Sequence, residues 1–288
     1  MGGRISRRQF LEGVIATSAA LYSPVVAAES RRLRHLTDRV KLGKSGIEVS
    51  YLGFGTGTKG WNKESNQTRV GIVKFARMVN HAYDLGINYF DVADIYGTHS
   101  YLRAALRHKP RESYVIQTKL WYRTCQDAWA DIDRFRQELE TDYIDILMIH
   151  CVDSAAWPVD LATFVDTLHT AKEKGIIRAH GMSFHSLKAM SAVPENPFVE
   201  VALTRINHAG AKMDGTVSEV LPVIRKIHDA GRGVVGIKIL GEGTIADSRH
   251  ESLAFVLGLD FVDAVVIGFE SAEQVDDIVR MGNEILAE

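Results

Sequence analysis

The sequence predicts an α/β protein that folds into one (β/α)8 barrel, the TIM-barrel architecture. From residue 49 onward, short apolar runs alternate with segments whose apolar residues recur about every 3.6 positions. About eight such strand–helix units fit into roughly 240 residues, close to the ~250 residues of a typical barrel. No break in composition suggests a second domain. One barrel domain is therefore the predicted fold.

The expected strands are short apolar runs that end in polar or turn-forming residues. They span residues 49–57, 87–94, 114–120, 144–151, 177–184, 199–207, 233–240 and 263–269. Helical periodicity covers residues 70–85, 128–139, 161–174, 217–230 and 272–286. Ser271 is a plausible N-cap for the last helix, with Glu273 in its first turn. Gly86, Gly175 and Gly231 stand where helices should stop in a left-handed residue.

An open, doubly wound sheet is the rival fold. It would require a Gly-x-Gly-x-x-Gly turn after an early strand, and residues 53–57 do not supply that spacing in phase. Residues 39–48 precede the first barrel strand and contain a turn at residues 44–46. This segment predicts a small hairpin that closes the barrel floor.

The N-terminal segment predicts an export signal rather than part of the fold. Arg7 and Arg8 precede an apolar stretch, residues 14–26, that is short for a membrane span and ends in small residues. The pattern resembles a twin-arginine signal over residues 1–28, followed by a leader, 29–38, and the barrel, 39–288. A retained anchor helix is the alternative.

The signal sets expectations for location and partners. We expect a periplasmic or otherwise exported protein that uses the twin-arginine export machinery and has no stable membrane association after cleavage. A net charge of −2 gives no reason to expect a nucleic acid or an acidic membrane surface as a partner. The two cysteines, Cys125 and Cys151, exclude a disulfide framework and a four-thiolate metal site.

Four chemically distinct side chains stand at or just beyond successive strand ends. Asp91, Lys119 and His150 close the expected strands two, three and four, and Tyr96 follows strand two. Barrel active sites lie at the carboxyl ends of the strands, so these side chains should share one mouth. We expect Lys119 to lower the pKa of the Tyr96 phenol, Asp91 to orient Lys119, and a neutral His150 to donate to the same oxygen. The set predicts a general acid beside a carbonyl.

These residues resemble the aldo-keto reductase family. Residues 90–97 are similar to its strand-two signature, with Asp91 and Tyr96 on the catalytic Asp and Tyr, and Lys119 and His150 match the next two catalytic positions. The resemblance implies the cofactor NAD(P)H and no metal. The cofactor-binding residues that it implies are Gly55, Thr56, Asp91, Ser183, Lys238, Ile239, Leu240, Gly268, Ser271 and Gln274.

The sequence departs from the family pattern at several cofactor positions. Phe184 replaces the Asn that follows Ser183, and the stacking aromatic after strand seven is absent. Glu270 and Glu273 stand where NADP-preferring members usually carry Lys or Arg, so the resemblance leaves NADP preference in doubt and favours NAD. Arg280 could offer a phosphate contact from the last helix.

Loop aromatics predict a substrate pocket for a small-molecule carbonyl. Trp61, Trp121 and Tyr122 should lie on the catalytic side of the barrel, although packing alone would also account for them. We expect Cys151 to point away from the mouth, because neighbouring residues of a strand alternate faces.

The predicted function is hydride transfer between NAD(P)H and an aldehyde or ketone, with Tyr96 as the general acid or base. One alternative is a cofactor-binding, redox-sensing barrel without efficient turnover, since fold and motif do not guarantee activity. Another is a metal-dependent hydrolase, which would need paired ligands that the first strand does not supply.

Overall fold

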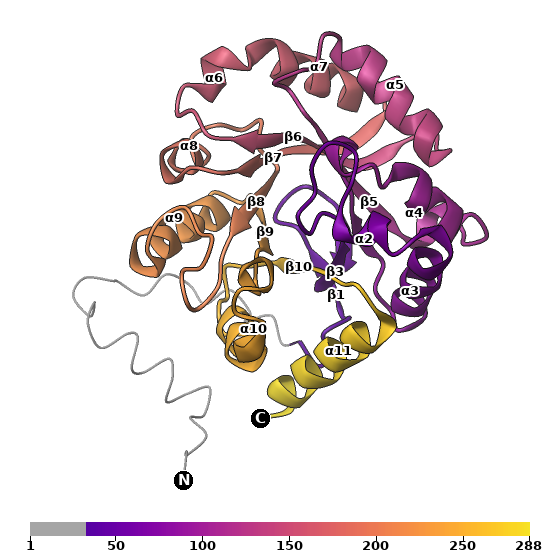
Figure 1. Ribbon diagram of the computed structural model, residues 1–288. Coiled ribbons are helices and arrows are strands. Elements are labelled where there is room, and N and C mark those ends of the chain that lie inside the picture. Colours follow the sequence, from indigo (N-terminus) through magenta and orange to yellow (C-terminus); the bar gives the residue numbers. More distant parts are fainter. Residues whose placement is uncertain (1–32) are drawn as a thin grey trace.

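The computed structural model describes residues 33–288, and the predicted signal segment, residues 1–28, lies outside them. The predicted barrel is confirmed: eight parallel strands close in the order β10-β3-β4-β5-β6-β7-β8-β9 (Figure 1). The strands are β3 (Leu52–Gly55), β4 (Tyr89–Asp91), β5 (Val115–Leu120), β6 (Ile144–Val152), β7 (Ile177–Phe184), β8 (Val201–Arg205), β9 (Gly233–Ile237) and β10 (Ala264–Gly268).

Helices surround the barrel on its outside (Figure 1). They are α2 (Asn66–Arg69), α3 (Ile72–Asp84), α4 (His99–Leu106), α5 (Ala128–Leu139), α6 (Trp157–Asp160), α7 (Ala162–Glu173), α8 (Leu187–Ser191), α9 (Val217–Asp229), α10 (Arg249–Leu257) and α11 (Ala272–Ala287). Short 3₁₀ turns are η1 (Asp94–Tyr96), η2 (Arg111–Ser113), η3 (Gly241–Gly243) and η4 (Ala246–Ser248). No described helix is long and apolar enough to cross a bilayer.

The predicted floor hairpin is present. Strand β1 (Arg39–Lys41) pairs antiparallel with β2 (Glu48–Ser50), and Gly43 bridges to Arg232, just before β9 begins. A Cβ on Gly43 would lie 2.4 Å from the Gly233 nitrogen, so the hairpin sits directly against the amino end of a barrel strand. The expected first strand, residues 49–57, was too long, because the chain turns at Tyr51 from the hairpin into the barrel.

Burial explains why the strands read as continuous apolar runs. Every residue of β5 is buried, as are all but one of β6. Strands of a parallel sheet are covered on both faces, by helices outside and by side chains inside. Helix α10 shows no clear 3.6-residue pattern because five of its nine residues are buried. Polar groups at the carboxyl ends of the strands are left to line one mouth.

Candidate active site

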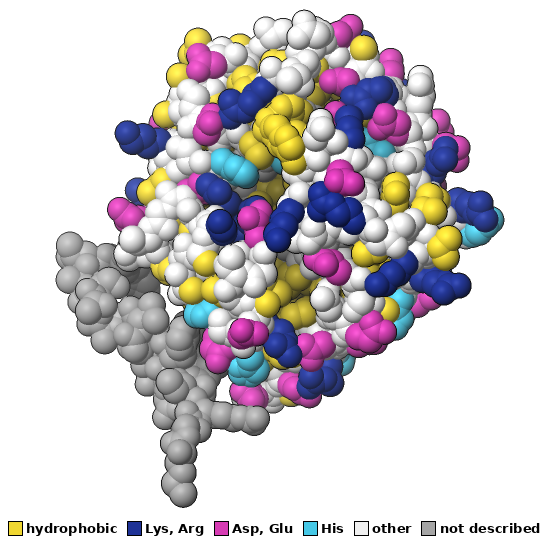
Figure 2. Space-filling model, viewed as in Figure 1, with side chains coloured by type: hydrophobic (Ala, Val, Ile, Leu, Met, Phe, Trp, Pro, Cys, Tyr) yellow, Lys and Arg dark blue, Asp and Glu magenta, His cyan; other side chains and the backbone are white. Residues whose placement is uncertain are grey.

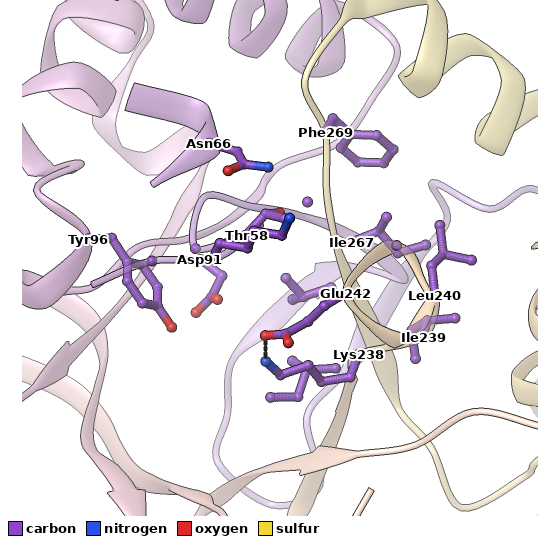
Figure 3. A pocket seen from close by; sticks show the side chains of 18 of the residues that line it. Thr58, Asn66, Asp91, Tyr96, Lys238, Ile239, Leu240, Glu242, Ile267 and Phe269 are labelled. Carbon is purple, nitrogen blue, oxygen red and sulfur yellow. Dashed lines mark hydrogen bonds and ion pairs between the residues drawn. The ribbon is translucent and has the colours of Figure 1, made fainter. Parts of the chain in front are cut away.

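A cavity of about 1160 Å³ opens at the carboxyl ends of the barrel strands. Most of the residues that the sequence placed in the site line it: Gly55, Trp61, Asp91, Tyr96, Lys119, Trp121, His150, Ser183, Lys238, Ile239, Leu240, Gly268 and Gln274. Figure 3 shows part of this cavity, with Tyr96 and Asp91 on the left and Ile239 and Leu240 on the right. Basic and acidic side chains are interspersed over this face of the molecule (Figure 2).

Three predicted site residues lie outside the cavity lining. The Thr56 hydroxyl donates to the Asp91 carbonyl at 2.9 Å and is fully buried. Tyr122 packs edge-on against Phe164. Ser271 caps helix α11, as the sequence predicted, by accepting from a backbone N–H.

Asp91 and Lys119 form a buried ion pair beneath the mouth. The Lys119 ammonium donates to Asp91 Oδ1 at 2.5 Å and to the Val92 carbonyl at 2.9 Å, and its side chain is 1% exposed. Gln117 donates to the same carboxylate oxygen. Burial lowers the pKa of Lys119, and the carboxylate of Asp91 opposes that shift. The pair fixes a positive charge next to the wall that carries Tyr96.

Tyr96 and His150 meet at the cavity wall. The Tyr96 hydroxyl lies 3.1 Å from His150 Nε2, and the two rings meet edge to face. Burial, with the nearby Lys119, holds the pKa of His150 well below its ordinary value, so the ring is neutral. His150 Nδ1 is buried without a partner among the described residues. An unpaired lone pair is tolerated better than an unpaired N–H, which favours a proton on Nε2 that donates to the phenol oxygen.

The expected effect of Lys119 on the tyrosine is wrong for this geometry. The pKa of Tyr96 is raised well above its ordinary value, mainly by burial and then by the negative charge of Asp91, with smaller effects of Cys151 and Glu242. The Lys119 ammonium lies 5.0 Å from the centre of the Tyr96 ring and donates its hydrogen bonds to Asp91 and to the backbone carbonyl of Val92. Desolvation therefore outweighs the attraction of the ammonium.

Two glycines hold the Tyr96 ring in place. A Cβ on Gly57 would lie 2.3 Å from Tyr96 Cε2, and a Cβ on Gly60 would lie 2.4 Å from Cδ1. Tyr96 ends η1, and Gly97 follows in the left-handed conformation with φ of 66°. A Cβ on Gly97 would lie 2.2 Å from the Lys63 carbonyl oxygen. The phenol can stand in this slot because backbone without side chains forms it.

A charged cluster anchors the turn that carries Tyr96. Asp94, in η1, pairs with Lys63 and with Arg134 of α5. Asp94, His99 and Glu138 form the one group among the described residues whose ligand atoms are spaced for a metal ion. Arg134 donates to both Asp94 and Glu138, so a guanidinium already supplies a positive charge to these carboxylates. The cluster ties the turn that carries Tyr96 to helix α5.

Cys151 lies in the cavity wall, contrary to the expectation that it points away. Its backbone is left-handed, with φ of 58°, and the β6–β7 register shifts between residues 149 and 152. Its N–H donates to Ser183 Oγ at 2.8 Å, and its sulfur lies 3.4 Å from His185 Nε2. Burial raises the pKa of the Cys151 thiol to about 11, so the thiol stays protonated at neutral pH. His185 also lines the cavity.

The far end of the cavity is acidic. Glu270, Glu273 and Asp277 line it. Asp277 accepts from Arg249 at 2.8 Å and from Arg280 at 2.7 Å, so both guanidinium groups are already paired with a carboxylate. Asn66 donates to Glu270 at 2.7 Å and joins α2 to the loop after β10.

The near end of the cavity has an aromatic wall. Trp61 is 62% exposed at the rim, and its ring meets Trp121 edge to face at 5.5 Å. Trp121 packs edge-on against His150 at the same centroid distance. Arg123 and Asp153 pair at 2.8 Å on the rim beside them. A substrate at this end would meet two indoles and one ion pair.

The residues present fit a nicotinamide dinucleotide. The volume of about 1160 Å³ exceeds the ~300–1000 Å³ of most small-molecule sites. Lys238 supplies a cation inside the cavity, and Ser183 supplies a hydroxyl to the same lining.

Comparison with known proteins agrees with this geometry. The aldo/keto reductase family model matches residues 51–254. L-galactose dehydrogenase of Arabidopsis thaliana is 26% identical over 221 residues, which are 72% of this chain and 66% of the relative. The 6-dehydroglucose reductase of Novosphingobium aromaticivorans is 30% identical over 202 residues, 64% of this chain and 59% of the relative. The chain thus spans about two thirds or less of these curated relatives.

Solved structures share the fold. An aldo-keto reductase-like protein of Pseudomonas aeruginosa superposes with a TM-score of 0.72 at 25% identity, covering 89% of this chain and all of that one. An aldo-keto reductase of Bacillus halodurans gives a TM-score of 0.66 at 19% identity over 87% of this chain and 95% of that one. With a family match that covers most of the barrel and its strand-end residues, this chain belongs to the aldo/keto reductase family.

Proposed function

We propose that this protein is an NAD(P)H-dependent oxidoreductase that interconverts an aldehyde or ketone and its alcohol, with Tyr96 as the proton donor. The observation that carries the proposal is the phenol of Tyr96 at the cavity wall, 3.1 Å from His150 and beside the buried Asp91–Lys119 pair. The bound cofactor supplies the hydride.

The raised pKa of Tyr96 suits the reductive direction. Its phenol keeps its proton at neutral pH, because burial and Asp91 disfavour the phenolate. The alkoxide that forms from a reduced carbonyl is a much stronger base than phenolate, so this proton is transferred downhill. His150 Nε2 donates to the phenol oxygen and fixes its direction, and Lys119 provides positive charge as the phenol loses its proton.

NADH is the proposed preferred cofactor. Glu270, Glu273 and Asp277 line the end of the cavity, and Asp277 already holds Arg249. A 2′-phosphate placed there would meet several carboxylates, and like-charge contacts cost several kcal/mol when poorly solvated. A ribose hydroxyl would instead find carboxylate acceptors.

A polyhydroxylated carbonyl is the proposed substrate class. The Trp61–Trp121 wall offers apolar faces, and the Arg123–Asp153 pair beside it offers donors and acceptors for hydroxyl groups. Two relatives are named for reactions of sugars, L-galactose dehydrogenase and 6-dehydroglucose reductase.

We also propose that the protein is exported by the twin-arginine route. This proposal rests on residues 1–28 alone and is tested by cell fractionation.

The deciding experiment compares the wild type with Tyr96→Phe. NADH and NADPH are titrated by fluorescence, and turnover is then measured with a panel of sugar and non-sugar carbonyls. We expect the variant to lose reduction while its NADH affinity stays within about twofold, because the lost hydroxyl acts on the carbonyl. Equal loss of binding and turnover would contradict the role of Tyr96. Tight NADH binding by a wild type that reduces nothing would favour a redox sensor.

A further inference from the structure

Lys238 and Glu242 form an ion pair inside the cavity. Figure 3 shows the Glu242 carboxylate turned toward the Lys238 ammonium, with Asp91 and Tyr96 to the left of the pair. Both residues line the cavity and both are largely buried, with side-chain exposures of 21% and 29%. Lys238 directly follows Ile237, the last residue of β9, so its side chain is positioned by the end of a barrel strand.

The backbone of this loop is held in an unusual shape. Lys238, Gly241, Glu242 and Gly243 all have positive φ, between 56° and 92°. Left-handed geometry is rare for Lys and Glu and persists where surrounding contacts impose it. Here Asn207 Nδ2 donates to the Lys238 carbonyl at 3.0 Å, and the Gly241 N–H donates to the same oxygen at 2.8 Å. The pinned backbone leaves side-chain rotation as the easy motion of the pair.

The other paired cations of the described lining are held from different elements. Lys119 pairs with Asp91, Arg123 with Asp153, and Arg249 with Asp277. Lys238 and Glu242 are instead four residues apart in one loop. A rotation of Glu242 alone therefore frees the Lys238 ammonium without disturbing a second element.

We propose that Glu242 is a built-in competitor of the cofactor, holding Lys238 in an internal ion pair that a phosphate group of the dinucleotide must displace. The inference rests on the proposed cofactor-binding function. An anion that approaches Lys238 gains its attraction only after Glu242 turns away, and it is repelled by that carboxylate until then. Glu242 thereby weakens cofactor affinity and speeds cofactor release.

The test measures binding directly rather than turnover. Glu242→Gln, Lys238→Gln and the double variant are titrated with NADH and with inorganic pyrophosphate, using the fluorescence of Trp61 and Trp121 at the cavity. Stopped-flow displacement then gives the NADH dissociation rate. Glu251→Gln, an exposed change on α10 outside the cavity lining, is the matched control.

We expect Glu242→Gln to bind NADH and pyrophosphate about tenfold more tightly, mainly through slower dissociation. Lys238→Gln should bind both about tenfold more weakly, and adding Glu242→Gln to it should restore little, because the two residues act through one contact. The control should stay within about twofold of the wild type. Thermal melting of each variant confirms that it is folded.

Unchanged or weaker NADH binding by folded Glu242→Gln would overturn the inference. An equal gain in NADH affinity when Glu242→Gln is added to Lys238→Gln would overturn it too, because Lys238 would then not be needed. In each case NADH binding by the wild type would leave the proposed function standing. A wild type that binds neither NADH nor NADPH would overturn both. If the wild type binds NADH and Tyr96→Phe keeps full activity, only the proposed role of Tyr96 would be refuted.

Discussion

A single methyl group at Gly57 should displace the phenol of Tyr96, the proposed proton donor. The Cβ of Gly57→Ala would lie 2.3 Å from Tyr96 Cε2 and 2.4 Å from Cζ, next to the hydroxyl. Carbon atoms pack at about 3.5 Å or more, so the ring must move by about 1 Å. That shift pulls the hydroxyl away from His150, which now lies 3.1 Å from it. The three atoms nearest to this Cβ all belong to the Tyr96 ring, so the clash falls first on that side chain.

The expected loss is about 10²-fold in kcat/KM for carbonyl reduction, the usual effect of a 1 Å misplacement of a reacting group. This equals about 2.7 kcal/mol in the barrier. Crowding of the slot should cost ~1–3 kcal/mol of folding stability, which leaves the protein folded. NADH affinity should change little if the defect lies in proton transfer.

Steady-state kinetics, NADH titration and thermal melting distinguish these effects. Gly60→Ala should act similarly from the other side of the ring, where its Cβ would lie 2.4 Å from Tyr96 Cδ1. Gly215→Ala is the matched control, because its Cβ would meet first a Glu219 side-chain oxygen at 3.2 Å. Wild-type kcat/KM in both Gly57→Ala and Gly60→Ala would refute the idea that this slot fixes the reactive position of Tyr96.

Two further predictions concern stability. Lys119→Met leaves the Asp91 carboxylate buried without its cation, so urea unfolding should show that the free energy of unfolding falls by about 3–5 kcal/mol. Adding Asp91→Asn should recover part of this stability. A fall below about 1 kcal/mol would contradict a buried ion pair. Burial lowers the pKa of His185 to about 4 in the folded protein. In the unfolded chain this imidazole is protonated near pH 6.5, whereas in the folded chain it stays neutral until the pH approaches 4. The stability that the neutral His185 contributes is complete above pH 6.5 and is lost as the pH falls toward 4. Between pH 7 and pH 4, the free energy of unfolding of His185→Asn should therefore fall by roughly 2–3 kcal/mol less than that of the wild type. Equal falls in the two proteins would refute the lowered pKa of His185.

Local patterns were sufficient to predict the barrel and to place polar strand-end residues at its mouth. Apolar runs and helical periodicity are properties of neighbouring residues, so they predicted the eight strands in their confirmed order along the chain. A residue at a barrel strand end must face the mouth, which placed Asp91, Lys119 and His150 in one cavity. The sequence also separated residues 1–28 from the fold, a prediction that lies outside the described residues.

Contacts between distant segments decided the rest. A register shift and a left-handed backbone turned Cys151 into the cavity, against simple strand alternation. The pKa of Tyr96 moved upward rather than downward, because burial and long-range charge are sums over groups that the chain brings together only on folding. Glu242 entered the cavity through the backbone shape of its loop. The sequence by itself determined that Asp91, Lys119 and His150 reach the mouth of this barrel. Only the tertiary structure decided that Cys151 and Glu242 join them, and how much water and charge surround each side chain, because both depend on contacts between distant segments.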